Sequence, residues 1–248
     1  GEFNRDTDYI DTRITADGRD GYPVEPGRYR LIVARACPWA NRTIIVRRLL
    51  GLEDVLSIGF CGPTHDERSW TFDLDPGEVD PVLGIHYLRD AYNARIPDYP
   101  KGVTVPALVE IESGQVVTND YAQITLDFST EWSAHHRDGA PQLYPEPLRA
   151  EIDEVAERVY TEINNGVYRC GFAGSQRAYE RAYDRLMDGM AQARSMDART
   201  VLVVTGKPRG GDAADRGERR VVTASCGLRH TLLHCGDGGV LACGKDYA

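Results

Sequence analysis

The sequence predicts an α/β domain followed by a helical domain. Within residues 28–50, a β-branched apolar run precedes an amphipathic helical pattern, which predicts a buried strand leading into a helix. Residues 103–118 hold a proline and two short β-branched runs around a glycine turn, which predicts a β-hairpin. From residue 148 onward, apolar residues recur at helical spacing, so the second half is expected to be helical.

The order of elements in the first half narrows the fold class. Residues 28–36 predict a first strand, residues 38–50 a helix and residues 55–60 a second strand. The hairpin and a further capped helix follow. This order matches the thioredoxin-like fold, so we predict a thioredoxin-like domain over residues 28–135.

Several helix ends carry recognisable signals. Pro38 sits in a first turn, where a helix tolerates proline, and Gly51 can end the same helix. Asp120 is suited to cap the later helix, with Gln123 as its reciprocal partner in a capping box. Ser175 is suited to cap a helix in the second half.

Cys37 stands at the predicted strand-to-helix junction. Unpaired N–H groups and the helix dipole stabilise an anion there, which lowers a cysteine pKa from ~8.5 into the range of ~3.5–7.5. Ala40 occupies the place of the second cysteine of a dithiol motif, so the site is monothiol and cannot resolve a mixed disulfide internally. A buried, inert cysteine is the alternative.

The remaining segments complete the predicted domain organisation. Residues 1–27 form an N-terminal arm, and a long insertion rich in turn formers covers residues 61–100, with one helical pattern at 85–93. The helical domain begins near residue 146, and residues 146–190 form its first part. Residues 191–248 lack helical or strand patterning, and we expect a divergent, poorly ordered tail.

The helical half shows one clear apolar stripe, formed by Leu148, Ile152, Val155, Val159 and Ile163. Asn164-Asn165-Gly166 is expected to stop or bend that helix. Two alternatives remain open for the inward face of the next helix: Ala182, Leu186 and Met190, or Tyr179, Tyr183 and Leu186.

Composition excludes several classes of function. The net charge of −9 and the lack of a long basic run argue against nucleic acid or an anionic membrane as partner. No apolar run approaches the ~20 residues that span a bilayer. The first residues are polar and acidic, unlike a signal or transit peptide, and the six cysteines are scattered. We expect a reduced, cytoplasmic protein with no metal.

Four stretches share the pattern of one protein family: Cys37-Pro-Trp-Ala-Asn-Arg, the segment around Trp70, Gly102-Val-Thr-Val-Pro106 and Asn164-Asn-Gly-Val-Tyr-Arg-Cys-Gly-Phe-Ala173. They resemble the Xi-class glutathione transferases, the glutathionyl-hydroquinone reductases, over residues 5–187. The resemblance implies a thioredoxin-like domain followed by an all-α glutathione-transferase-type domain. It also implies an enzyme that reduces glutathionyl-hydroquinones, and a homodimer built largely through the helical half.

The resemblance implies roles for individual residues. Cys37 is the nucleophile, and a second glutathione resolves the mixed disulfide. Trp70 packs on glutathione, with a core or lid tryptophan as the alternative. Val105 precedes a cis proline and offers its backbone to the thiol peptide. Tyr168 hydrogen-bonds a phenolic oxygen of the quinone or hydroquinone conjugate, with helix-end packing as the alternative.

Two features depart from the family pattern. Asp120-Tyr121 replaces the usual Glu-Ser pair that holds the γ-glutamyl end, so another low-molecular-weight thiol is an alternative to glutathione. After about residue 187 the family's helical continuation is absent, which a shifted reading frame or a divergent tail would produce. A catalytically silent fragment that binds a thiol or a protein is therefore the second function class.

Limited proteolysis tests the expectation for the tail. We expect the first cuts between Lys207 and Arg220, because this stretch is basic and has no element pattern, leaving a resistant core that ends near residue 190. The fragments are identified by mass spectrometry. A tail that resists the protease, in a chain that unfolds in one cooperative transition at high temperature, contradicts this expectation.

Overall fold

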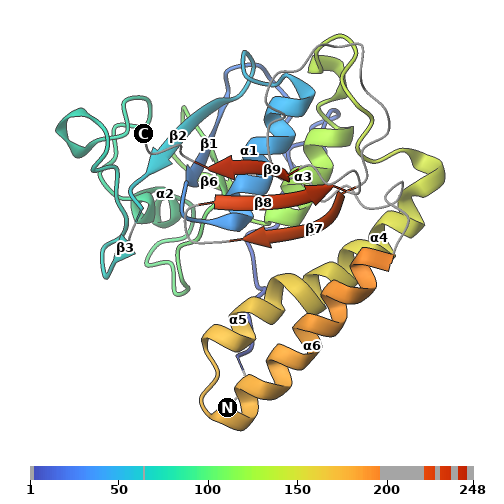
Figure 1. Ribbon diagram of the computed structural model, residues 1–248. Helices are drawn as coiled ribbons and strands as arrows, with labels where there is room; N and C mark the ends of the chain where they lie inside the picture. Colours follow the sequence, from blue (N-terminus) through green and yellow to red (C-terminus); the bar gives the residue numbers. More distant parts are fainter. Residues whose placement is uncertain (1–2, 64, 196–220, 227–229, 236–239, 245–248) are drawn as a thin grey trace. The chain divides into compact units, whose positions relative to one another are not determined.

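A four-stranded sheet forms the centre of residues 8–142, one of two units in the computed structural model (Figure 1). The strand order is β2-β1-β5-β6, with bounds Ser57–Cys61, Tyr29–Ala34, Ala107–Glu110 and Val116–Thr118. β1 pairs in parallel with β2 and antiparallel with β5, and β5 pairs antiparallel with β6. All six residues of β1 are buried, as expected of a central strand.

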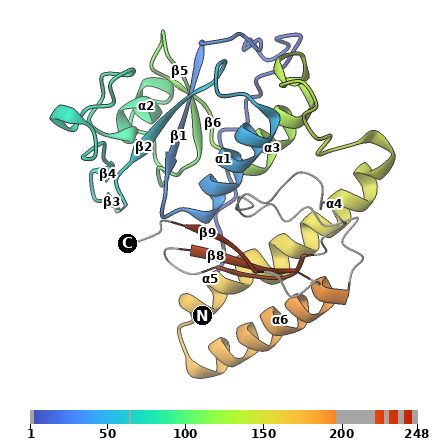
Figure 2. The same ribbon diagram turned by 45° about the horizontal axis from the view of Figure 1, so that its top comes forward.

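Three helices cover this sheet. α1 (Pro38–Leu50) and α3 (Tyr121–Thr130) lie side by side on one face, and α2 (Leu88–Arg95) lies on the other (Figures 1 and 2). The short 3₁₀ turn Ser133–His135 follows α3. The chain order β1-α1-β2-α2-β5-β6-α3 confirms the predicted thioredoxin-like class.

The helix caps agree with the sequence except at one side chain. Pro38 opens α1, and Gly51 ends it in the left-handed region, with φ of 74°. The Asp120 carboxylate accepts hydrogen bonds from the backbone N–H groups of Ala122 and Gln123. The predicted capping box is wrong, because the Gln123 side chain does not bond the backbone N–H of Asp120. Its amide donates to Asp127 at 2.8 Å instead.

The insertion over residues 61–100 carries more structure than its sequence predicted. A two-stranded ribbon of β3 (His65–Asp66) and β4 (Ser69–Trp70) is followed by the 3₁₀ turn Pro76–Glu78. The predicted helix is present as α2, although it begins at Leu88 rather than residue 85.

A buried ion pair holds the insertion to the sheet. Arg30 of β1 is 6% exposed and Asp80 of the insertion is 0% exposed. Arg30 Nε and Nη2 lie 3.0 and 2.9 Å from Asp80 Oδ2, and Asp80 Oδ1 accepts the N–H groups of Val82 and Leu83. The carboxylate is therefore paired and hydrogen-bonded on both oxygens, as a buried charge requires.

The second unit comprises residues 1–7 and 143–248. Its helical part runs through the 3₁₀ turn Glu146–Leu148, α4 (Arg149–Arg158), the π-helix η4 (Val159–Asn164), α5 (Asn165–Gly171) and α6 (Gln176–Ser195). Of the two outcomes expected at Asn164–Gly166, the stop is wrong, because the chain passes from π-helix to α-helix there without leaving helical geometry. The bend stays a prediction. The first seven residues of the predicted arm belong to this unit.

Glycines allow the helices of this unit to pack closely. A Cβ at Gly166 of α5 would lie 3.2 Å from Leu186, and one at Gly189 of α6 would lie 2.7 Å from Glu162. Ala182 of α6 is buried, whereas Tyr179 and Tyr183 are 40% and 45% exposed, so the first of the two predicted inward faces is correct. Ser175 caps α6 as predicted, accepting from Ala178 N–H at 3.3 Å.

The structure describes residues 3–63, 65–195, 221–226, 230–235 and 240–244. Within the predicted tail, β7 (Val221–Cys226), β8 (His230–Cys235) and β9 (Val240–Gly244) form an antiparallel sheet in chain order. Sequence reasoning did not predict these strands. The expectation of poor order concerns many residues outside the described ranges and stays a prediction. Among the described helices, none combines the length and apolarity needed to cross a membrane.

Asp80→Ala tests the anchoring of the insertion. We expect the free energy of unfolding to fall by about 3–5 kcal/mol, because the substitution leaves the Arg30 charge buried without its partner. Urea unfolding followed by tryptophan fluorescence measures the loss. Glu67→Ala removes an exposed carboxylate from the same insertion and serves as control, with an expected change within about 0.5 kcal/mol. Equal effects of the two substitutions would show that the pair does not anchor the insertion.

Candidate active site

Cys37 is the N-cap residue of α1, as predicted. It has extended backbone angles, φ −93° and ψ 114°, and its carbonyl accepts the first intrahelical hydrogen bond from Asn41 at 3.0 Å. Its own N–H donates to Ala34 at the end of β1, which closes the turn between strand and helix. The half-buried side chain therefore lies where the free N–H groups of a helix favour an anion.

The Cys37 thiol lies against the loop that precedes β5. Its Sγ donates to the backbone carbonyl of Val105 at 3.4 Å. The Val105-Pro106 peptide bond is cis, as predicted, and the Val105 side chain is buried. Within the described part of the chain, the Val105 N–H has no hydrogen-bond acceptor. This N–H is therefore available to an extended peptide lying beside the thiol.

Two side chains fix the loop before β5 through hydrogen bonds to Thr104. The Tyr92 hydroxyl donates to the carbonyl of Thr104 at 2.8 Å, and the Asn119 amide donates to the Thr104 hydroxyl at 2.8 Å. Asn119 is in turn fixed by Ile10, whose N–H donates to its side-chain oxygen. These supporting residues were missed because their partners lie up to 109 positions apart in the sequence.

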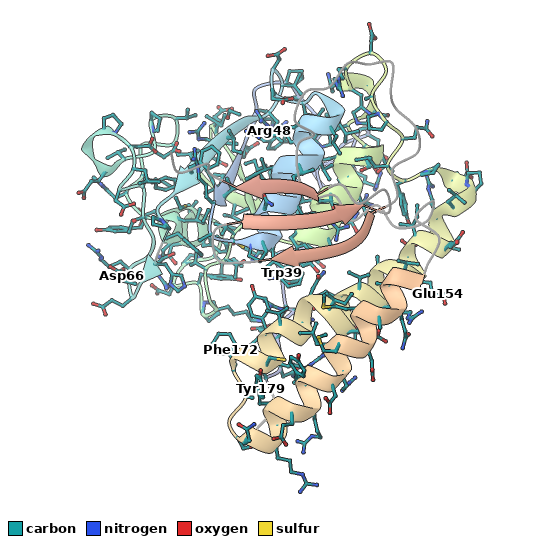
Figure 3. All side chains as sticks on the ribbon, viewed as in Figure 1. Trp39, Arg48, Asp66, Glu154, Phe172 and Tyr179 are labelled. Atoms are coloured by element: carbon teal, nitrogen blue, oxygen red, sulfur yellow. The ribbon has the colours of Figure 1, made fainter. Side chains whose placement is uncertain are left out.

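Asp120 and Tyr121 lie where β6 passes into α3. One oxygen of Asp120, Oδ1, is occupied by the helix cap. The Tyr121 ring is 7% exposed and packs on Trp39 of α1, with ring centroids 4.5 Å apart. Figure 3 labels Trp39 at the start of α1. Tyr121 thus joins two helices by packing, and Trp39 was missed as a site residue although it belongs to the Cys37-Pro38-Trp39 motif.

Trp70 lies on β4, half-buried, and its ring faces His65 across the ribbon with centroids 4.8 Å apart. Its neighbour Ser69 is held at φ of 95°, in the region that favours glycine, so the backbone leading into Trp70 is strained. Trp70 and Cys37 belong to the same unit, residues 8–142.

Tyr168 lies on α5 in the second unit, within an aromatic stack. Its ring centroid is 5.8 Å from that of Phe3 and 6.3 Å from that of Phe172, and the Arg5 guanidinium lies 4.2 Å from it. Figure 3 shows Phe172 at the end of the unit where α5 turns into α6. The sequence did not predict Phe3 and Arg5 as site residues, because their partners are distant in the chain: Arg5 donates to Asn165, 160 positions away.

The thiols of Cys61 and Cys170 have raised pKa values. Burial raises the pKa of Cys61, and nearby carboxylates, Asp80 foremost, raise it further. Burial also raises the pKa of Cys170. Since the thiolate is the nucleophile, both thiols are weaker candidates than one at a helix N-terminus. Among the described residues, no group of three or more side chains is arranged to hold a metal ion.

The chain resembles characterised proteins in sequence. It is 37% identical over 200 residues to glutathionyl-hydroquinone reductase YqjG of Escherichia coli, covering 77% of this chain and 61% of that protein. It is 40% identical over 172 residues to glutathionyl-hydroquinone reductase PcpF of Sphingobium chlorophenolicum, covering 68% and 54%. The chain thus spans less than two thirds of the length of these relatives. No protein-family model matches it.

Solved structures show the same relationship. A glutathione transferase from Gordonia bronchialis is 76% identical with a TM-score of 0.74, covering 75% of this chain and 58% of its own. The Xi glutathione transferase of Phanerochaete chrysosporium is 37% identical with a TM-score of 0.72, covering 78% and 66%. Glutathione-bound YqjG of Escherichia coli is 37% identical with a TM-score of 0.69, covering 74% and 62%. With this sequence and fold, the chain belongs to the Xi-class glutathione transferase family.

Proposed function

We propose that this chain is a glutathione-dependent reductase that acts on glutathionyl-hydroquinone conjugates through the single thiol of Cys37. One observation carries the proposal: Cys37 caps α1 while its Sγ lies 3.4 Å from the carbonyl before the cis proline. The named activity of two relatives supplies the substrate class. A relative whose structure holds glutathione supports this thiol over another low-molecular-weight thiol.

The reaction needs two displacements at sulfur. The Cys37 thiolate attacks the glutathionyl sulfur and forms a mixed disulfide, while the carbon–sulfur bond to the ring breaks. The ring carbon keeps the bonding electron pair and takes a proton, which releases the hydroquinone. The thiolate of a second glutathione then attacks the mixed disulfide, giving glutathione disulfide and free Cys37. A second glutathione is needed because Ala40 stands where a resolving cysteine would be.

The other site residues have roles in binding. The Val105 N–H and carbonyl lie beside the thiol, where they can pair with the backbone of glutathione. Asp120 has a second carboxylate oxygen that the helix cap does not use, and it can accept from the γ-glutamyl ammonium. Trp70 is proposed to pack on glutathione. Tyr121 is proposed to shape the thiol site through its contact with Trp39.

Tyr168 is proposed to hydrogen-bond the phenolic oxygen of the conjugate. Its ring is stacked in the aromatic cluster of the second unit, which gives the side chain a fixed position on α5.

A cytoplasmic location, a homodimer and the lack of nucleic-acid or membrane partners stay predictions.

A silent thiol-binding or protein-binding fragment is the second candidate function. It is favoured by the part of its relatives that the chain matches, which is 61% of YqjG and 54% of PcpF. Both candidate functions predict binding of a thiol, but only the reductase predicts turnover. Calorimetric binding of glutathione without release of hydroquinone would support the second.

Alkylation against pH tests the predicted state of Cys37. We expect the rate of iodoacetamide labelling at Cys37 to reach half its maximum well below pH ~8.5, because the helix N-terminus favours the thiolate. Peptide mass spectrometry assigns the labelled site. Cys61 and Cys170 should react only at higher pH, since burial raises their pKa. Preferential labelling of either would overturn the assignment.

Substitution of Cys37 tests covalent catalysis. Cys37→Ser should reduce hydroquinone release to the uncatalysed background, because the hydroxyl cannot form the mixed disulfide. Ala40→Cys should add weak disulfide-reducing activity, because a resolving thiol is restored. Release is followed by chromatography, and Cys170→Ser is the matched control with unchanged turnover. Full turnover by Cys37→Ser would exclude this mechanism.

A further inference from the structure

The second unit holds a cavity of about 530 Å³ that the proposed thiol chemistry does not use. It lies between the first residues of the chain and the helices η4, α5 and α6. The residues on which its chemistry depends are Phe3, Arg5, Tyr160, Asn165, Arg169 and Arg185. A volume of about 300–1,000 Å³ is typical of sites for small organic ligands.

Three guanidinium groups line this arginine cavity, and no carboxylate does. Arg169 Nη1 donates to the backbone carbonyl of Thr161 at 2.6 Å, which aims the group without neutralising it. Within the described residues, neither Arg169 nor Arg185 forms an ion pair, whereas Glu162 nearby lies 3.9 Å from Arg158. The cavity therefore has an excess of positive charge that an anion would offset.

The third guanidinium is held in a fixed orientation. Arg5 Nε donates to the side-chain oxygen of Asn165 at 2.7 Å, and Asn165 is 5% exposed. The Arg5 guanidinium also lies over the Tyr168 ring, 4.2 Å from its centroid. Because these contacts fix the plane of the group, little side-chain entropy remains to be lost when an anion binds.

We propose that the arginine cavity binds a small aromatic carboxylate. A planar carboxylate matches the paired N–H groups of arginine, and the rings of Phe3 and Tyr160 in the lining offer contact area to an aromatic body. This site needs no thiol, so it goes beyond the proposed reductase function. Carboxylate binding is measured without turnover, so a failure of this proposal can be told apart from a failure of the proposed reductase function.

Calorimetry of the full chain with 4-hydroxybenzoate tests the proposal near neutral pH and at constant ionic strength. We expect saturable binding that is at least about tenfold tighter than that of the neutral isostere 4-hydroxybenzamide, because the amide loses the charged hydrogen bonds. Equal affinity of the two compounds, or no binding of the benzoate, overturns the proposal. Inorganic phosphate is the competitor. Displacement of the benzoate at equal concentration would show a general anion site and would likewise overturn it.

Two matched variants of α6 locate the site. Arg185→Gln removes an exposed charge that lines the cavity, and we expect the benzoate to bind at least about fivefold more weakly. Arg177→Gln removes another exposed charge from the same helix, at a residue that does not line the cavity, and its affinity should match that of the unchanged chain. Circular dichroism verifies the helix content of both. Equal losses in both variants would assign the binding to overall charge and reject this site.

Discussion

The burial of Arg30 in a central strand is the constraint on which the arrangement of the first unit depends. Its charge can remain between β2 and β5 only beside a partner, and Asp80 supplies that partner from the insertion. Gly59 of β2 faces the pair so closely that a Cβ there would lie 2.6 Å from Asp80 Oδ2. The pair therefore leaves no room for a side chain at position 59 and holds the segment around Asp80 against the sheet.

The predictable part of the fold depends on residues close together in the sequence. Pro38 and Asp120 mark helix starts through their own backbone chemistry, so both were identified without the structure. The role of Gln123 could not be predicted in this way, because its amide donates to Asp127 instead of to the helix start. The pair of Arg30 and Asp80 could not be predicted either, since two residues fifty positions apart leave no periodic pattern in the sequence.

In the candidate site, too, some residues can be predicted from local sequence and others depend on distant contacts. Cys37 and the cis bond after Val105 follow from short motifs, and the contact between them joins elements 68 positions apart. The residues behind the loop, such as Asn119, are visible only once β6 and the N-terminal arm have been placed. Asn165 shows the converse case. Its local pattern predicted a helix stop or bend, but the chain continues in helical geometry there, and the buried Asn165 side chain accepts a hydrogen bond from Arg5.

The anchoring pair also bears on which thiol can react. Cys61 ends β2, directly beside the strand that holds Arg30, and its pKa is raised first by burial and then by the negative charge of Asp80. The carboxylate that neutralises a buried cation in the sheet therefore also opposes ionisation of the neighbouring thiol. Cys37 follows the C-terminal end of β1, whereas Arg30 is near the start of that strand. The unpaired N–H groups of the α1 N-terminus favour the thiolate of Cys37. The proposed selectivity for Cys37 over Cys61 therefore depends on the same charges and helix ends that position the sheet.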